Sequence, residues 1–493
     1  MMFDMTPEER NRAIAMWGLA LCLCAAACGW IFIRFGQAWS VADLPESENV
    51  VRIVPAYIIT EVAFIPLGAK LADVFGCRRV LLIGPLIFIL GSMLCIMSVS
   101  VEMLIACRFI QGVGGGLVLG LAFTAVGRYY EKDKRGKCHE LMTASFAIGS
   151  LFGSAFGYFL VDNFNWRMGF VALSVMMLVG FIIAIKLLPT DVGDDSKLDY
   201  KNLIPVTALF GVAAYYTQSV NVDFKLLSAP SLITAFVIIV LVMVVLRESR
   251  KSSNPLIPIN ITVFEKKLIF LMFVFSMCGL GLIQYFFKLY LTYYEFDIYN
   301  ASLMFGLLIA GAATPSILGS RLVLKTGVRP WIVVGSILVT IALVLTHFIV
   351  GMGIVQFGLS IFLFGMGLGC IVTQIIISTQ SITPREEMGK HTGNLMAVRM
   401  IGILVGNAVV GSYIAEVKNA NYVPDVIDIS SADMLLKVIA EHMSNDLQYV
   451  ADALNDGFTA CVVIMAVVTA FLTFVAYSLG KDDKIEEEKK EVE

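Results

Sequence analysis

Charged residues are scarce in this chain. Lysine, arginine, aspartate and glutamate make up 15% of its 493 residues, whereas a soluble domain carries about a quarter. Hydrophobic residues make up 58%. A soluble fold of this length could not keep such a surface in water, so the composition indicates that lipid surrounds most of the chain. The formal net charge of -3 is too small to indicate a nucleic acid or another polyanion as a partner.

Motifs of the large enzyme classes are also missing. The sequence has no HExxH zinc motif, no phosphate-binding P-loop and no nucleophile elbow, so we predict that it is not an enzyme and does not drive export with ATP by itself. It also lacks the repeated polar rings or filter loop of a one-chain pore. Most of the ten cysteines fall inside apolar runs, where small buried residues are expected rather than metal ligands. No cofactor and no metal are expected.

Long apolar runs, in contrast, are abundant. A helix needs about 20 apolar residues to cross a bilayer, and fourteen runs meet that need. They lie near residues 13–36, 50–71, 79–99, 103–126, 141–162, 168–188, 203–220, 229–247, 268–293, 301–323, 330–350, 354–380, 391–415 and 457–479. The sequence therefore predicts an all-α polytopic membrane protein.

The distribution of cations predicts the orientation of these spans. If the N-terminus is cytoplasmic, Lys and Arg gather in the inner connections, such as "YYEKDKRGK" at 129–137 and "RESRK" at 247–251, while the outer connections lean acidic. Positively charged loops stay in the cytoplasm. We expect a multi-pass protein of the cell membrane with both termini cytoplasmic. Three histidines, His139, His391 and His442, are expected in loops.

One short stretch between the second and third spans carries several charges. "AKLADVFGCRR" at 69–79 includes Asp73, Gly76, Arg78 and Arg79. Gly76 permits a tight turn, and Asp73 is expected to accept hydrogen bonds near the start of the third span, at the positive end of the helix dipole. Arg78 and Arg79 can pair with Asp73 or with a neighbouring helix end. The alternative interpretation is a cationic membrane anchor with a turn glycine.

The same stretch resembles the loop 2–3 signature of the major facilitator superfamily, G-x-L-A-D-[RK]-x-G-[RK]-[RK]. It departs from that signature at three positions, Ala69, Val74 and Cys77. A second signature is better preserved. "LIACRFIQGVGGG" at 104–116 matches the span 4 pattern L-x-x-x-R-x-x-Q-G-x-G through Leu104, Arg108, Gln111, Gly112 and Gly114.

The fifth span contains three glycines four residues apart, Gly149, Gly153 and Gly157, which share one helix face. Close packing of helices by small residues explains such a pattern by itself. The segment also resembles the span 5 signature of the antiporter branch of the superfamily, but Ser154 and Tyr158 replace its proline and last glycine. The resemblance implies that these glycines, with Gln111, Gly112 and the 73–79 loop, take part in conformational gating.

Further segments resemble the fourteen-helix drug:proton antiporter family of that superfamily. The spans at 203–220 and 229–247 correspond to its additional pair, "NPLIPINITVFEKK" at 254–267 to its linker, and the segment around Arg399 and Gly402 to its span 13 signature. "GSRLVLKTGVRP" at 319–330 is similar to the 69–79 stretch. The resemblance implies a major facilitator fold, with two six-helix bundles and two additional transmembrane helices around a central cavity.

The resulting domain prediction has five parts. They are a cytoplasmic N-terminus (1–12), an N-terminal six-helix bundle (13–190), a two-helix insertion (200–250), a C-terminal six-helix bundle (260–480) with a long outer loop (416–456), and a charged cytoplasmic tail (481–493).

Ionisable residues inside the spans are candidates for function, because each costs a few kcal/mol in the bilayer. Glu61, in the second span, has no charged neighbour in sequence and is the candidate proton-coupling residue. The alternative is a carboxylate permanently paired with an arginine. The family resemblance implies that Arg108 faces the core and tunes a nearby acid.

A second group of residues is predicted to bind substrate. Trp30 and Arg34 lie in the first span, Gln284, Tyr285 and Lys288 in the ninth, and Arg399 in the thirteenth. Arg34 and Lys288 could instead extend to the outer interface. If they face the cavity, its excess of cations favours anionic or zwitterionic substrates.

The sequence therefore predicts a monomeric, proton-coupled antiporter that exports small amphipathic molecules or drugs by alternating access. Its partners are the small-molecule substrate, protons and the lipid bilayer, and the proton gradient supplies the energy. Two alternatives stay open: an exporter of an anionic metabolite, and a membrane receptor or scaffold that does not transport.

Overall fold

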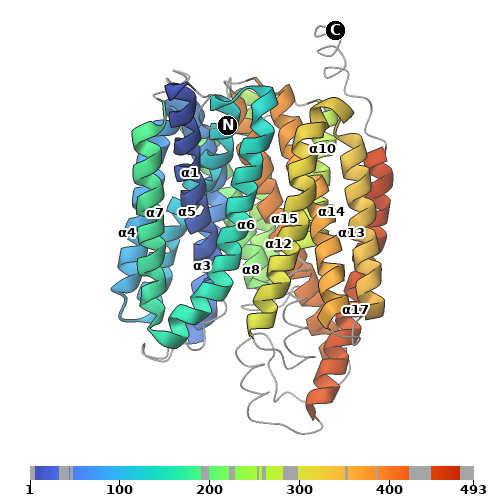
Figure 1. The fold of residues 1–493 in the computed structure, drawn as a ribbon. Coiled ribbons are helices and arrows are strands. Elements are labelled where there is room, and N and C mark those ends of the chain that lie inside the picture. Colours follow the sequence, from blue (N-terminus) through green and yellow to red (C-terminus); the bar gives the residue numbers. More distant parts are fainter. Residues whose placement is uncertain are drawn as a thin grey trace. The chain divides into compact units, whose positions relative to one another are not determined.

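The computed structural model describes residues 6–32, 44, 48–189, 199–220, 228–252, 255–257, 262–280, 298–349, 354–384, 387–420 and 446–477. Within these residues the secondary structure is helical, with no strand, as Figure 1 shows. The α-helices are α1 (Pro7–Ile31), α3 (Ile53–Phe75), α4 (Cys77–Ile96), α5 (Val101–Tyr129), α6 (Lys132–Asn163), α7 (Trp166–Leu187), α8 (Tyr200–Ser219), α9 (Ala229–Lys251), α10 (Val263–Phe275), α12 (Ile298–Thr326), α13 (Arg329–Ile349), α14 (Ile354–Ile382), α15 (Met388–Ala420) and α17 (Asp446–Tyr477).

These fourteen α-helices confirm the predicted all-α class, because one helix lies on each of the fourteen predicted spans. Eight of them are apolar and long enough to cross a membrane by length and composition, counted over the described residues. A short 3-10 helix, η1 (Glu48–Arg52), precedes α3, and a π-helical turn, η2 (Ser276–Leu280), follows α10. The predicted outer loop and charged tail lie largely outside the described residues.

The chain forms two compact units. The first contains residues 1–214, 237–262 and 376–397, and the second contains 215–236, 263–375 and 398–493. Within the first unit, α1, α3, α4, α5, α6 and α7 pack side by side (Figure 1). The boundaries of the predicted domains stay a prediction.

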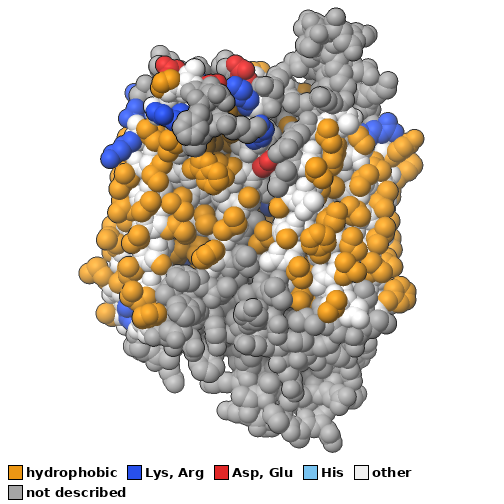
Figure 2. Space-filling view, in the orientation of Figure 1, with side chains coloured by type: hydrophobic (Ala, Val, Ile, Leu, Met, Phe, Trp, Pro, Cys, Tyr) orange, Lys and Arg blue, Asp and Glu red, His pale blue; other side chains and the backbone are white. Residues whose placement is uncertain are grey.

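Apolar side chains cover the outward faces of the first unit. On α4, Leu82, Ile83, Leu86, Leu90 and Met93 are all exposed. Figure 2 shows a broad face of such hydrophobic side chains, with Lys and Arg gathered mainly at one end of this unit. A surface of this kind is stable in hydrocarbon rather than in water, so the described helices have the character of a multi-pass membrane protein.

Glycines bring α3 and α5 into close contact. A Cβ at Gly112 would overlap the carbonyl oxygen of Tyr57, and one at Gly116 would overlap that of Glu61. A third glycine, Gly120, lies against the carbonyl oxygen of Ile65 in the same way. The three glycines are four residues apart and therefore share the face of α5 that contacts α3.

The second unit repeats this contact between α12 and α14. Gly365 lies against the carbonyl oxygen of Leu308, and Gly369 against that of Ala312. The turns that end α3 and α12 also match, because Gly76 and Gly327 both have positive φ, 84° and 79°. The similarity between 69–79 and 319–330 thus extends to backbone conformation and helix packing, as expected of two related halves.

This close packing predicts a thermal effect. Gly112→Ala should lower the thermal midpoint of the purified protein by about 1–3 °C, because overpacking costs about 1–3 kcal/mol. Gly211→Ala is the matched control, since its Cβ would meet Ala63 Cβ at an ordinary 3.4 Å. Thermal unfolding in detergent measures both variants, and equal midpoints would contradict the packing argument.

Candidate functional site

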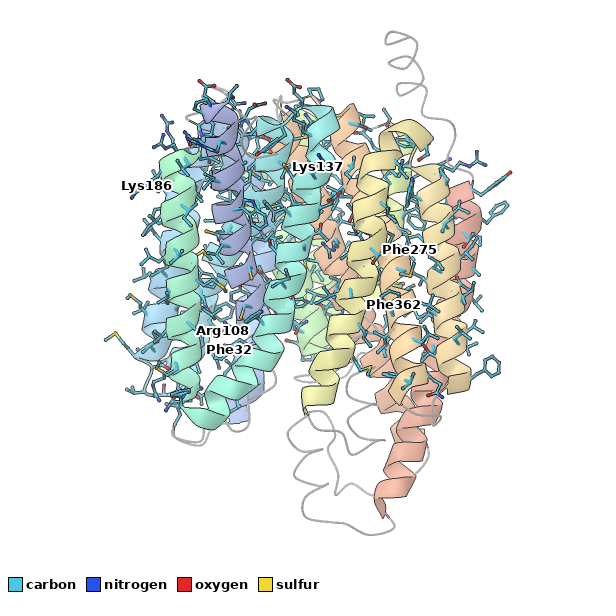
Figure 3. The ribbon with its side chains drawn as sticks, viewed as in Figure 1. Phe32, Arg108, Lys137, Lys186, Phe275 and Phe362 are labelled. Atoms are coloured by element: carbon cyan, nitrogen blue, oxygen red, sulfur yellow. The ribbon has the colours of Figure 1, made fainter. Side chains whose placement is uncertain are left out.

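Arg108 forms the centre of a buried polar cluster in the first unit. Its side chain, on α5, is fully buried. The guanidinium donates to Gln111 Oε1, to the carbonyl oxygen of Gly29 at 2.9 Å and to that of Ile53 at 3.5 Å. It also lies 4.4 Å from the centroid of the Tyr57 ring, a cation–π contact. Figure 3 labels Arg108 and Phe32, the residue that follows α1; both lie against the Phe170 ring, 5.9 Å from Arg108 Cζ and 5.4 Å from the Phe32 ring centroid.

Gln111 extends this cluster to α4. Its Nε2 donates to Ser92 Oγ at 2.7 Å, and Ser92 in turn donates to the carbonyl oxygen of Phe88. Gln111 and Ser92 are both fully buried. The arginine charge is therefore dispersed over carbonyl and amide oxygens from α1, α3 and α5, as a buried cation requires.

Glu61 lies beside Arg108 but is not paired with it. Its carboxyl is 2% exposed and has one hydrogen-bond partner among the described residues, the Tyr57 hydroxyl at 3.2 Å. Tyr57, whose ring contacts Arg108, lies one turn before Glu61 on the same face of α3. The permanent ion pair that the sequence left open is absent from the described residues. An ionised Glu61 would be stable only if water or a cation reached it.

The Tyr57 hydroxyl has two acceptors for a single proton. It lies 3.0 Å from the carbonyl oxygen of Ala26, on α1, and 3.2 Å from Glu61 Oε1, on α3. A hydroxyl donates one hydrogen bond at a time at full strength. The carbonyl oxygen of Ala26 and the Glu61 carboxyl therefore compete for one hydroxyl hydrogen. We call Tyr57, Glu61, Arg108 and Gln111 the buried charge cluster.

Asp73 caps the N-terminus of a helix far away in sequence. Its Oδ1 accepts from the backbone N–H of Gly389 at 2.9 Å, and its Oδ2 accepts from that of Lys390 at 2.8 Å. These are first-turn amides of α15, which have no partner within the helix. The carboxylate also meets the positive end of the helix dipole. We call this arrangement the Asp73 cap.

Arg128, at the end of α5, supplies a nearby cation. Its Nη1 lies 3.8 Å from Asp73 Oδ1 and donates to the carbonyl oxygens of Ala72 and Asp73. Arg78 is half-buried and Arg79 is exposed at the start of α4. In the described ion pairs, the partner of Asp73 is Arg128 rather than Arg78 or Arg79.

One expectation about the 69–79 stretch is thus corrected. Asp73 accepts hydrogen bonds from the start of α15 and not from the start of α4. The reason is geometric, because Asp73 lies in the last turn of α3 and a helical side chain leans towards the N-terminus of its own helix, away from α4. Gly76 acts as predicted in allowing the turn, with φ of 84°.

Small residues fit around the Asp73 cap. A Cβ at Gly389 would overlap the carbonyl oxygen of Ala69 and come within 2.6 Å of Asp73 Oδ1. A Cβ at Gly393 would overlap the methyl group of Ala69. Gly393 therefore makes room for the alanine that replaces the first glycine of the signature.

The glycines of α6 lie against α1. A Cβ at Gly149 would overlap the carbonyl oxygen of Cys24, and one at Gly153 would come within 2.8 Å of that of Cys28. Gly157 lies in the same helix, but its surroundings are outside the described residues. The packing that the spacing predicts is therefore present at two of the three positions.

The predicted substrate-binding residues are described only in part. Trp30 is half-buried on α1, with its ring centroid 6.3 Å from that of Phe146 on α6. Arg399 is half-buried on α15, in the second unit. Arg34, Gln284, Tyr285 and Lys288 lie outside the described residues. Substrate binding by these residues stays a prediction.

Some residues of the site were not identified from the sequence. Tyr57 could have been found, because it precedes Glu61 by four residues on one helix face. His139 was expected in a loop but is buried within α6, where its Nε2 lies 2.6 Å from Gln380 Oε1. Among the described residues, no group of three His, Cys, Asp or Glu side chains could hold a metal ion.

Comparisons with known proteins agree with this architecture. The family model described as Major Facilitator Superfamily matches residues 19–407. The multidrug transporter protein MdtP of Bacillus subtilis is 24% identical over 458 residues, covering 85% of this chain and 78% of the relative. The multidrug resistance protein Stp of Mycobacterium tuberculosis is 26% identical over 389 residues, covering 76% and 70%.

Solved structures show the same fold at low sequence identity. The human organic anion transporter MFSD10 aligns with a TM-score of 0.64 at 15% identity, over 96% of this chain and all of the other. The proton:xylose symporter XylE aligns with a TM-score of 0.60 at 14% identity, over 93% and 95%. At these identities the likeness concerns the fold alone.

Proposed function

Because the chain belongs to the Major Facilitator Superfamily, a family of transporters rather than enzymes, we propose that it is a proton-coupled antiporter that exports small amphipathic molecules or drugs across the cell membrane. The observation that carries the proposal is the Tyr57 hydroxyl, which lies between Glu61 of α3 and a carbonyl oxygen of α1. The names of the curated relatives support the substrate class.

The proposed coupling starts with the buried charge cluster in the state in which Glu61 is protonated. With Glu61 neutral, Tyr57 donates to the carbonyl oxygen of Ala26 and holds α1 against α3. When Glu61 loses its proton, the carboxylate draws the Tyr57 hydrogen bond to itself, since bonds to a charged acceptor are about twice as strong as neutral ones. The contact between α1 and α3 then weakens. One proton thereby favours one packing of these helices over the other.

Arg108 keeps its place during this exchange. Its guanidinium is held by carbonyl oxygens from α1 and α3 and by Gln111, so it does not need Glu61 as a counter-ion. A fixed positive charge next to Tyr57 stabilises the carboxylate when it forms. Arg108 therefore acts on Glu61 through its charge, without an ion pair between the two side chains.

The Asp73 cap is the proposed closure of the cytoplasmic end. The connections between spans at 73–79 and 385–391 carry cations, and the positive-inside rule places such connections in the cytoplasm. Breaking two charge-assisted hydrogen bonds of about 1.5–3 kcal/mol each would release the start of α15. Protonation at Glu61 and release at Asp73 together give alternating access.

The test is proton-driven flux in vesicles made with the purified protein. A pH gradient should drive accumulation of one class within a panel of cationic, neutral and anionic amphipathic compounds, and a proton ionophore should abolish it. Accumulation of anionic compounds alone would favour the anion exporter, and no driven flux of any compound would favour the receptor or scaffold.

A further inference from the structure

A buried asparagine pair attaches the linker after α9 to the N-terminal part of α15. Asn202 Oδ1, on α8, accepts from the backbone N–H of Leu256 at 2.7 Å. Asn394 Nδ2, on α15, donates to the carbonyl oxygen of Leu256 at 2.6 Å. Both polar groups of one peptide residue are thus bound by side chains from two different helices. We call Asn202, Leu256 and Asn394 the Leu256 bridge.

The bridge is buried and its polarity is fixed. Asn202 is 1% exposed, Leu256 2% and Asn394 7%. The Nδ2 of Asn394 also donates to the carbonyl oxygen of Lys390 at 2.7 Å, so a reversed amide would place its oxygen against two carbonyl oxygens. The Nδ2 of Asn202 donates to Ser249 Oγ at 2.7 Å and joins α8 to α9. Each amide therefore has one orientation.

The bridge and the Asp73 cap share a residue. Lys390 donates its N–H to Asp73 Oδ2, and its carbonyl oxygen accepts from Asn394. A continuous series of hydrogen bonds runs from α9 through α8, the linker and α15 to α3. All of these residues lie in the first unit.

From this series we infer that Asn202 and Asn394 are positioning residues for transport, through which the additional helix pair α8–α9 holds the start of α15 against Asp73. The pair is then part of the closure and not a passive insertion between two bundles. The inference rests on the proposed role of the Asp73 cap as the closure. The Leu256 bridge would then hold the start of α15 in addition to the hydrogen bonds of the Asp73 carboxylate.

The same substitution, Asn→Asp, should preserve the hydrogen bond with Leu256 at position 202 and break it at position 394. Asn202→Asp keeps the oxygen that Leu256 needs, and Ser249 can turn its hydroxyl to donate to the second oxygen. Asn394→Asp removes the donor to the carbonyl oxygen of Leu256 and sets a carboxylate against the carbonyl oxygens of Leu256 and Lys390. The helix dipole favours an acid at Asn202, in the first turn of α8, but does not extend to Asn394, in the second turn of α15. A role in helix stability alone is therefore distinguished by Asn202→Leu, which would then leave the Lys390 amide of α15 unchanged.

The experiment is hydrogen exchange of the full-length protein in lipid nanodiscs, read at the amides of Leu256 and Lys390. Asn202→Leu and Asn394→Asp should each speed exchange at Lys390 about two- to tenfold. Asn202→Asp should leave both amides within about twofold of the unchanged protein. Thermal midpoints check that each variant is folded.

Two results would overturn the inference. In the first, Asn202→Leu speeds hydrogen exchange at the Leu256 amide but not at the Lys390 amide, and the bridge is then a local contact. The second applies if Asn202→Leu does not fold: Asn202→Asp and Asn394→Asp then change hydrogen exchange at Lys390 equally. Hydrogen exchange is measured without substrate, so these results can be told apart from a failure of the proposed antiport. If hydrogen exchange at Lys390 changes but substrate flux does not, the Leu256 bridge exists but the Asp73 cap is not the closure, and the two asparagines have no role in transport.

Discussion

Glu61→Gln should abolish transport driven by a pH gradient, lowering accumulation in vesicles to the level of vesicles without the protein. Glutamine has the volume of the neutral acid and can accept from the Tyr57 hydroxyl, which is the partner of Glu61 in the structure. It cannot release a proton. Exchange of substrate for substrate, which needs no proton, should continue at most of its normal rate. The measurement is dye accumulation and dye counterflow in the same vesicle preparation.

Tyr57→Phe provides the matched control for that result. It removes the hydroxyl that contacts both Ala26 and Glu61 but leaves the carboxyl and the ring beside Arg108. Driven accumulation should be slowed rather than abolished, because the carboxyl can still carry the proton. Full driven accumulation by Glu61→Gln would remove Glu61 from the coupling mechanism.

Asp73→Asn should open the Asp73 cap. An asparagine offers one acceptor oxygen to two backbone N–H groups and turns a donor towards the other, so one charge-assisted hydrogen bond is lost and one amide is left facing a donor. The loss of about 1.5–3 kcal/mol should speed hydrogen exchange at Gly389 and Lys390 about 10–100-fold. Driven transport should fall as well, because closure of this end is required for alternating access.

Glu387→Gln is the control for the cap variant. Glu387 pairs with Lys390 Nζ at 3.2 Å but its side chain is 45% exposed. Exposed ion pairs contribute at most about 1 kcal/mol, so exchange at Gly389 and Lys390 should change less than about fivefold. Equal effects of Asp73→Asn and Glu387→Gln would mean that charge near α15, and not the cap geometry, holds this segment.

The number and the order of the helices follow from the sequence because the signal is local. An apolar run of span length is complete within itself, and each of the fourteen runs holds a helix. Glu61 was found for the same reason, since a charge within an apolar run is conspicuous without knowledge of its neighbours. Arg108 was found through the family resemblance of the fourth span. Gly76 was found because a turn between two helices requires a positive φ.

The partners of these residues could not be found in this way. Asp73 binds amides 316 and 317 positions later in the chain, and those amides belong to the backbone of Gly389 and Lys390. A backbone donor has no side chain to mark it in a sequence. The contacts of Leu256 with Asn202 and Asn394 are hidden for the same reason, because the linker offers only its peptide groups. Interactions between distant segments therefore needed coordinates.

The matched helix crossings of the two units carry different side chains. Where the crossing of α3 and α5 places Glu61, the crossing of α12 and α14 places Ala312. If Glu61 is the group that carries the proton, as we propose, one proton is exchanged in each cycle. Swapping one proton for one monovalent cation moves no net charge, so membrane voltage would contribute nothing to its export. A neutral compound would move one charge per cycle and gain about 2.3 kcal/mol for each 100 mV.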